Sequence, residues 1–166
     1  MNWDKITNII LIAALAVLAV FAMLGLYQWI TRKSIKKVDK NLLAMFVPLI
    51  LMVIVFVIFE KVLILNTRPD GSGEPSFPST HTMVSATIFA LAALNLKNYI
   101  KSKPLRITLY IIMAILTILV PVGRVLANKH WISDVVAGLV FAAIFAAIYY
   151  LIIRRAKNAE HLHENH

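Results

Sequence analysis

The chain has 166 residues, 60% of them hydrophobic, and its mean hydropathy is +0.80. Soluble domains are about 45–50% apolar, so an excess of this size arranged in long runs predicts a membrane protein. The chain contains no cysteine, which excludes a disulfide framework, a thiol nucleophile and a thiolate metal site. A net charge of +9 would suit nucleic acid, but its placement between apolar segments argues against that partner.

Five apolar segments follow one another, each bounded by charged or turn residues. They cover residues 6–30, 42–66, 82–98, 105–122 and 131–153. Each is close to the roughly 17–25 residues that a helix needs to cross a bilayer. We therefore predict an all-α protein, a bundle of five transmembrane helices that forms one membrane-embedded domain over residues 1–166. The first segment is too long for a removable signal peptide, and Asp4 spoils the positive start that such a peptide needs.

Lysine and arginine residues divide unequally between the two sides of this predicted bundle. Five lie in the loop after the first segment, four around the loop after the third and three in the C-terminal tail, against five on the other side. Positively charged loops remain in the cytoplasm. The N-terminus is therefore expected to face out, the C-terminus to face in, and the polar segment 68–82 to face out.

The two loops on the expected outer side carry most of the unusual polar residues. These are Lys61, Arg68, Ser79, His81, Arg124, His130 and Asp134. Charged groups at membrane depth are costly and usually mark function. Lys61 and Arg68 are seven residues apart, so a helix continued through Leu65 would place both on one face.

The segment Pro78-Ser79-Thr80-His81 comes just before the third apolar segment. Ser79 or Thr80 is a natural N-cap, so backbone N–H groups and the positive end of a helix would point outward beside His81. Such a helix end is a seat for an anion.

His130 and Asp134 are four residues apart at the start of the fifth segment, with Arg124 six residues earlier. The carboxylate can accept a hydrogen bond from one imidazole nitrogen, which fixes the tautomer and leaves the other nitrogen basic. Three cations together suit a tetrahedral anion with about two negative charges, of which phosphate is the obvious candidate. One histidine can then act as nucleophile and a second can protonate the leaving oxygen.

Each of these residues also has an ordinary structural interpretation. Lys61 suits a lysine that snorkels at the end of a helix, Arg68 an interfacial anchor, and Pro78-Ser79 a simple helix cap. Asp70 and Glu74 are expected to be solvated turn residues. These interpretations do not explain why all the candidates share one side of the membrane.

The same residues, in order and spacing, resemble the three-part signature of the type 2 phosphatidic acid phosphatase (PAP2) superfamily. The three parts read Lys61-x6-Arg68-Pro69, Pro78-Ser79-x-His81 and Arg124-x5-His130-x3-Asp134. They lie within residues 61–134, nearly half of the chain. The superfamily includes membrane lipid phosphatases and soluble vanadium haloperoxidases.

The resemblance implies a role for each residue. His130 would be the nucleophile that forms a phosphohistidine, Asp134 its orienting partner and His81 the general acid. The phosphate oxygens would be held by Lys61, Arg68, Ser79 and Arg124, with backbone N–H groups near Thr80. The resemblance implies no metal and no cofactor for phosphatase work.

Two positions depart from the commonest form of the signature. Gly123 stands where the third part usually begins with serine, and Thr80 stands where the second part usually has glycine. Membrane members commonly have six spans, whereas five are counted here, and the missing span would precede the signature.

The expected function is therefore hydrolysis of a terminal lipid phosphate at the outer face of a bacterial inner membrane. Family members of this kind act on undecaprenyl diphosphate, phosphatidylglycerol phosphate or lipid A 1-phosphate, and the sequence does not choose among them. An anion-binding transporter or channel is the alternative. Such a protein needs polar residues at the bilayer midplane, where the first, fourth and fifth segments have almost none. An oxidant enzyme that holds vanadate is a third hypothesis, which the membrane embedding disfavours. The oligomeric state is not predicted.

Overall fold

The fold of this chain is helical throughout. The computed structural model describes residues 1–164, and side chains as far as Asn158. Within that range it contains no β-strand, and its one isolated bridge joins Thr67 to Pro75. In chain order the elements are α1 (Trp3–Arg32), a 3₁₀ turn η1 (Ile35–Lys37), α2 (Lys40–Ala44), α3 (Phe46–Val57), a π-helical turn η2 (Ile58–Val62), α4 (Thr80–Tyr99), α5 (Lys103–Leu126) and α6 (Ile132–Glu164).

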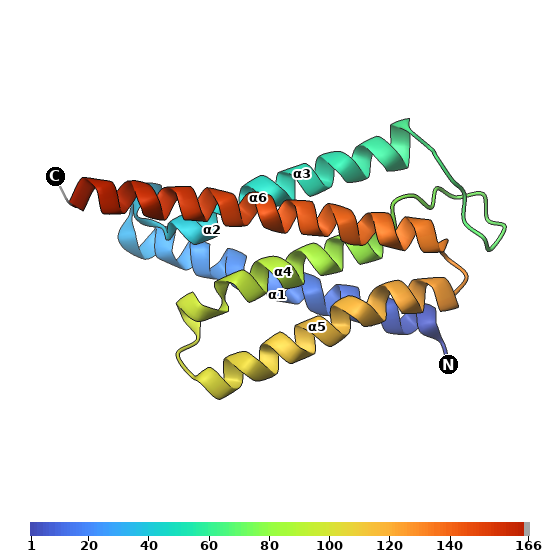
Figure 1. Ribbon diagram of the computed structural model, residues 1–166, viewed down its shortest axis with the longest axis horizontal. Helices are drawn as coiled ribbons and strands as arrows, with labels where there is room; N and C mark the ends of the chain where they lie inside the picture. The colour runs from blue at the N-terminus through green and yellow to red at the C-terminus, as the bar shows by residue number, and fades with distance from the viewer. Residues whose placement is uncertain (165–166) are drawn as a thin grey trace.

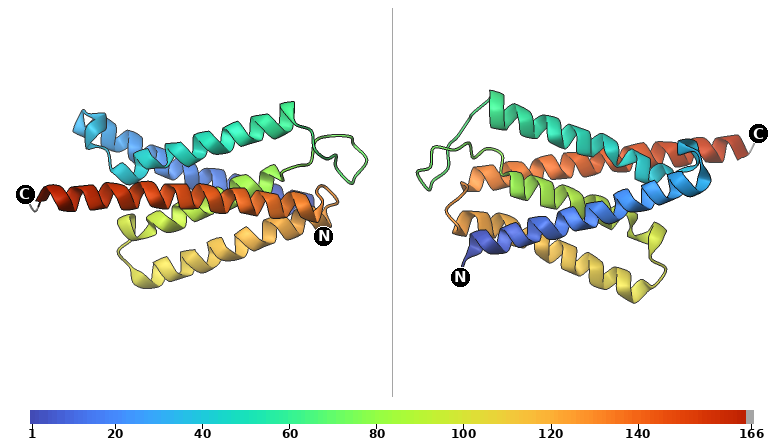
Figure 2. Two further views of the ribbon diagram at one scale, coloured as in Figure 1. Left: turned by 45° about the horizontal axis from the view of Figure 1, so that its top comes forward. Right: turned by 180° about the vertical axis from the view of Figure 1, so that it is seen from behind.

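The long helices run side by side and define two ends of the molecule (Figure 1). One end, called here the site end, holds the N-terminus, the loop of residues 63–79 and the loop of residues 127–131. The other, called the basic end, holds α2, the connection between α4 and α5, and the C-terminal part of α6 (Figure 2). The three segments richest in lysine and arginine therefore lie at one end of the bundle, as their grouping in the sequence predicts.

Four helical segments are long and apolar enough to cross a membrane. They are Trp3–Arg32, Lys40–Val62, Lys103–Leu126 and Ile132–Asn158. These segments make the chain a multi-pass membrane protein. α4 is the fifth long helix, and it packs against α1, α5 and α6 in the middle of the bundle (Figure 1).

α4 is less apolar than its neighbours because several of its buried positions are polar. Thr82, Ser85, Thr87 and Asn95 are all fully buried. The Thr87 hydroxyl donates to the backbone of its own helix, and Asn95 accepts a hydrogen bond from the hydroxyl of Tyr149, 2.9 Å away. Neighbouring helices cover this helix, so these polar groups face protein rather than lipid, although the Ser85 hydroxyl has no hydrogen-bond partner among the described residues.

The second helical segment ends earlier than the sequence suggested. Its last turn is π-helical, where the Leu63 N–H donates to the Ile58 carbonyl at 2.8 Å, and the helix stops at Val62. The following residues are drawn into a hairpin, in which the Ser76 N–H donates to the Asn66 carbonyl at 3.0 Å. The expectation that a helix through Leu65 places Lys61 and Arg68 on one face is therefore wrong.

Two glycines let neighbouring helices approach closely near the site end. A Cβ atom on Gly138 of α6 would lie 3.0 Å from the Ser79 carbonyl oxygen and 3.1 Å from Thr82 Cβ, both at the start of α4. A Cβ atom on Gly123 of α5 would lie only 2.6 Å from Thr7 Cγ2 of α1. The absence of side chains at these positions brings the beginnings of α1, α4 and α6 and the end of α5 together.

Candidate active site

The two loops at the site end fold against each other. Lys129 Nζ lies 2.8 Å from Asp70 Oδ2, and the indole N–H of Trp131 donates to the Thr67 carbonyl at 2.9 Å. Hydrogen bonds from Lys129 and Ser72 hold the pKa of the Asp70 carboxyl well below its usual range. The carboxylate is therefore charged at neutral pH, and the ion pair joins the two loops.

The loop of residues 63–79 is a hairpin rather than a loose turn. The Arg68 N–H donates to the Glu74 carbonyl at 3.0 Å. Between them Gly71 and Gly73 have φ values of 78° and 73°, a left-handed conformation that glycine adopts without steric cost. Asp70 and Glu74, expected to be solvated turn residues, both form ion pairs within the site-end loops.

His130 lies between α5 and α6, with only 4% of its side chain exposed. Its Nδ1–H donates to the Ser76 carbonyl at 2.8 Å, so the proton is on Nδ1 and Nε2 carries the free lone pair. Burial, followed by the positive charge of Arg124, lowers the pKa of His130 to about 4. At neutral pH the imidazole is therefore uncharged and can attack an electrophile through Nε2.

Asp134 sits on the next turn, fully buried, but it is not the hydrogen-bond acceptor of the imidazole. Its Oδ2 lies 3.8 Å from His130 Nδ1 and instead accepts the Trp131 backbone N–H at 2.9 Å. This bond caps the start of α6. The sequence suggested that the carboxylate fixes the tautomer by direct contact, whereas in the structure the Ser76 carbonyl does so. Asp134 contributes a nearby negative charge, which favours the protonated form of His130 and opposes the effect of burial.

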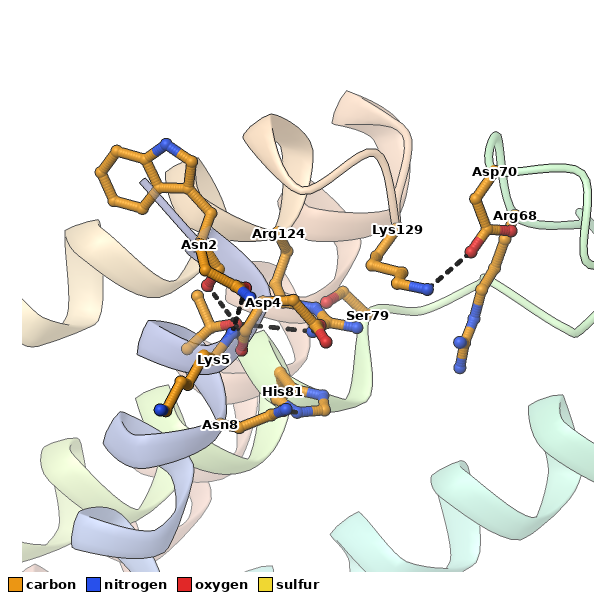
Figure 3. A network of polar contacts seen from close by, with 12 residues as sticks. Asn2, Asp4, Lys5, Asn8, Arg68, Asp70, Ser79, His81, Arg124 and Lys129 are labelled. Atoms are coloured by element: carbon orange, nitrogen blue, oxygen red, sulfur yellow. Dashed lines mark hydrogen bonds and ion pairs between the residues drawn. The ribbon is translucent and has the colours of Figure 1, made fainter.

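The first turn of α4 lies beside Arg124 and the start of α1 (Figure 3). Ser79 is the N-cap and is fully buried, its side chain makes no capping bond, and its hydroxyl accepts a hydrogen bond from Thr82 at 3.1 Å. The Ser79 N–H donates to the Asp134 carbonyl at 3.0 Å, which ties the start of α4 to α6. His81 follows on the first turn, with its Nε2 2.7 Å from Asn8 Oδ1 of α1.

Arg124 comes from the last turn of α5 and is almost fully buried. Its Nη1 donates to Asp4 Oδ1 at 2.6 Å and to Thr7 Oγ1 at 3.4 Å, both on α1. Its Nε is buried and has no hydrogen-bond partner among the described residues. A buried guanidinium N–H without an acceptor is costly, so this atom is suited to an incoming anion.

Arg68 repeats this arrangement on the hairpin. Its Nη1 lies 2.6 Å from Glu74 Oε2, while its Nε is buried and, within the described part of the chain, lacks a partner. The charges of Arg68 and Arg124 both act on His130. Two arginines thus border the neutral imidazole, each held by a carboxylate at Nη1 and free at Nε.

Not every predicted residue joins this group. Lys61 is exposed on η2, and its side chain forms no hydrogen bond or ion pair with another described residue. Thr80 is half-buried as the first residue of α4, where its backbone belongs to the unsatisfied first turn. The structure thus brings His81, Ser79, Arg124, His130 and Asp134 together at the site end, borders them with Arg68 and leaves Lys61 apart. Among the described residues no three His, Asp or Glu side chains are arranged to hold a metal ion.

Sequence reasoning missed the residues that α1 and the hairpin backbone supply. Asp4, Thr7 and Asn8 occupy positions i, i+3 and i+4 at the start of an otherwise apolar segment, so their side chains share one helical face. That polar face was the available signal. The role of the Ser76 carbonyl could not be predicted from the sequence, because every residue type carries a backbone carbonyl.

A family model described as the PAP2 superfamily matches residues 60–158, more than half of the chain. The chain belongs to the PAP2 superfamily.

Two relatives of this PAP2 chain show what it is similar to. Lipid A 1-phosphatase of Porphyromonas gingivalis is 34% identical over 85 residues, which are 51% of this chain. The chain spans only 18% of that curated relative. The crystal structure of a transmembrane PAP2 type phosphatidylglycerolphosphate phosphatase from Bacillus subtilis superposes with a TM-score of 0.68 at 19% identity, covering 95% of this chain and 79% of that one. The latter similarity shows a shared fold.

The PAP2 signature departs from its usual form at Gly123 for a reason that the structure supplies. The Trp3 ring and the Thr7 methyl group occupy the space into which a side chain at position 123 would project. A serine hydroxyl is replaced here by contact with α1, whose Thr7 hydroxyl instead approaches Arg124.

Proposed function

We propose that this PAP2 protein is a membrane lipid phosphatase that removes a terminal phosphate through a phosphohistidine intermediate on His130. The observation that carries the proposal is the buried, neutral imidazole of His130, with Nε2 free, beside two arginines whose buried Nε atoms lack acceptors. A neutral nucleophile surrounded by cationic donors suits attack on a tetrahedral anion.

The first proposed step transfers the phosphoryl group to the enzyme. The lone pair of His130 Nε2 forms a bond to phosphorus while the bond from phosphorus to the lipid oxygen breaks. Burial lowers the pKa of His81 to about 4 in the free protein, so the bound phosphate anion stabilises the protonated ring. Protonated His81 then gives a proton to that oxygen, so the lipid leaves as an alcohol, or as a monophosphate when the substrate is a diphosphate.

The second proposed step releases phosphate. Neutral His81 takes a proton from water, the resulting hydroxide attacks phosphorus, and the P–N bond to His130 breaks. Inorganic phosphate leaves, and both imidazoles return to their starting states. No metal takes part in either step.

Charge stabilisation is the main contribution of the protein to both steps. Arg124, Arg68 and the first-turn N–H groups of α4 donate to the phosphate oxygens, with the Ser79 hydroxyl beside them. Preorganised donors of this kind are usually the largest single contribution to catalysis. Lys61, which is exposed, meets the phosphate only if its long side chain reaches across from η2.

The lipid tail lies among apolar side chains of the bundle. An apolar cavity of about 420 Å³ is lined by α1, α2 and α3, with Phe21 and Leu42 among its walls. Phe21 is seventeen residues along α1 from Asp4, so the cavity lies about 25 Å from the site along that helix. A long hydrocarbon chain whose head is in the site would cover that distance after entering sideways from the bilayer.

The site acts on the outer face of a bacterial inner membrane. The three basic segments share the end of the bundle opposite to the site, and positively charged segments stay in the cytoplasm. The candidate substrates are undecaprenyl diphosphate, phosphatidylglycerol phosphate and lipid A 1-phosphate. All three carry a phosphate within reach of the membrane surface.

Phosphate release in detergent tests the proposal. Purified protein is mixed with each of the three lipids in the presence of a metal chelator, and inorganic phosphate is measured for wild type and His130→Ala. We expect turnover of at least one lipid by wild type with chelator present, and a loss of about 1,000-fold or more in the variant. A variant as active as wild type would remove His130 from the mechanism, and turnover that stops with chelator would remove the metal-free chemistry.

A further inference from the structure

One face of α1 reaches into the candidate site from outside the region that the family model matches. That region begins at residue 60, whereas the contacts come from Asp4 and Asn8 in the first two turns of the chain (Figure 3). Each contact ends on a basic group of the proposed machinery, Arg124 in one case and His81 in the other.

The contact with Arg124 is made at one edge of the guanidinium. Asp4 Oδ1 lies 2.6 Å from Nη1, and the Arg124 side chain is 3% exposed while that of Asp4 is 43% exposed. The neighbouring edge, formed by Nε and Nη2, is a pair of parallel donors that matches two oxygens of a phosphate. The Nε of that edge is buried and has no acceptor among the described residues. The Asp4 carboxylate thus holds the guanidinium at Nη1 and leaves the edge formed by Nε and Nη2 open.

The contact with His81 fixes an imidazole ring. Its Nε2–H donates to Asn8 Oδ1 at 2.7 Å, which determines both the tautomer and the ring orientation. Asn8 carries no charge, so it orients the ring without changing the electrostatic balance of the site. A general acid depends on such orientation because its proton must meet the leaving oxygen.

Close packing keeps α1 in register for both contacts. Gly123 has no side chain, and Thr7 Cγ2 and the Trp3 ring fill the space above it, 2.6 Å and 3.3 Å from where a Cβ atom would be. The same turn of α1 that carries Asp4 is therefore seated on the same turn of α5 that carries Arg124.

We propose that the outer end of α1 is a working part of the active site, in which Asp4 positions Arg124 and Asn8 positions His81. The proposal rests on the proposed function, since it assigns these two residues to the same phosphate site. It differs from the opposite idea, that Asp4 competes with phosphate for Arg124. Competition would require the Asp4 carboxylate to cover the edge of Arg124 formed by Nε and Nη2, which it leaves open.

Steady-state kinetics and inhibition by inorganic phosphate separate the two ideas. For Asp4→Ala we expect kcat/KM to fall about 10- to 100-fold and phosphate to inhibit more weakly, because the guanidinium loses its orientation. For Asn8→Ala we expect a fall in kcat with little change in phosphate inhibition, because His81 meets the leaving oxygen rather than the phosphate. Asp4→Glu should recover part of the loss.

Asp39→Ala is the matched control at the basic end. Asp39 Oδ1 pairs with Arg32 Nη1 of α1 at 3.1 Å, so this variant also removes an ion pair that tethers α1, but at the far end. We expect a lower melting temperature with unchanged phosphate inhibition. If Asp4→Ala behaves like this control, or if phosphate inhibits it more strongly than wild type, positioning by α1 is overturned while the phosphatase stands. If wild type neither turns over lipid nor binds phosphate, both proposals fall.

Discussion

The Nδ1–H of His130 donates to the backbone carbonyl of Ser76, 2.8 Å away, so one site-end loop sets the tautomer of a residue in the other. A backbone carbonyl does not ionise, so this acceptor remains available at every pH. The free lone pair therefore stays on Nε2 whenever the ring is neutral. The nearby carboxylate of Asp134, 3.8 Å from Nδ1, acts through its charge.

The titration of His130 is the first prediction. Its pKa is lowered to about 4, chiefly by burial and then by Arg124, so the ring stays neutral down to a pH far below the usual midpoint near 6.5. NMR of ring-labelled histidine, with His130→Asn to identify the signal, should give a midpoint close to 4. Because the unfolded chain binds this proton more readily, the contribution to stability is complete above about pH 6.5 and is lost as the pH falls toward 4. A midpoint near 6.5 would contradict the burial of this ring.

The approach of α4 and α6 at Gly138 gives the second prediction. In Gly138→Ala the new methyl group would press on the Ser79 carbonyl, 3.0 Å away, and on the Met83 N–H, 3.2 Å away, neither of which can rotate aside. We expect a loss of about 1–3 kcal/mol in the free energy of unfolding and a clear fall in activity. Gly25→Ala is the control, since its Cβ would meet only Leu42 Cδ1 at 3.8 Å. Equal effects of the two substitutions would show that helix contact at Gly138 is not what matters.

The seat of α1 on α5 gives the third prediction. Gly123→Ala should reduce stability and activity because its methyl group would lie 2.6 Å from Thr7 Cγ2. Thr7→Ser removes that methyl but keeps the hydroxyl that donates to the Trp3 and Asp4 carbonyls. The double variant Gly123→Ala/Thr7→Ser should therefore regain part of the stability that Gly123→Ala loses. A double-mutant cycle should give a coupling of about 1 kcal/mol between the two sites. Strictly additive losses would refute the contact as the cause.

The ion pair between the loops gives the fourth prediction. Asp70→Asn and Lys129→Met each break the link of 2.8 Å that joins the hairpin to the α5–α6 loop. We expect either change to lower kcat/KM about two- to fivefold, as suits a partly exposed pair, with a smaller difference from wild type at high salt. The double variant should be no worse than either single variant. A double variant with multiplied losses would mean that the two residues act separately.

The part of the site that the signature residues form could be predicted from the sequence. Their order placed His81, Arg124 and His130 at one end of a helical bundle, and in the structure the charges of Arg124 and His130 both act on His81 there. Long apolar segments predict where the long helices lie because each must span a similar thickness. α4 shows the limit of hydropathy alone, since a helix enclosed by others tolerates buried polar side chains such as Asn95.

The features that the sequence did not reveal depend on tertiary contacts. The helix ends at Val62 because the following residues are recruited into the hairpin, so Lys61 and Arg68 do not share a helical face. Asp134 caps α6 by accepting the Trp131 N–H rather than a hydrogen bond from His130. The spacing of these residues in the sequence does not distinguish the two partners. The contacts of Asp4 and Asn8 join residues more than seventy positions apart in the chain, beyond the reach of local pattern.

Direct detection of the covalent intermediate tests the central claim. Wild-type protein is incubated briefly with lipid substrate carrying a radiolabelled terminal phosphate, quenched in alkali to preserve phosphohistidine, and digested for mass spectrometry. We predict one labelled phosphoryl group on the peptide that contains His130, and none in His130→Asn. Label on a different residue, or substrate turnover that persists in His130→Asn, would contradict the assignment of His130 as the nucleophile.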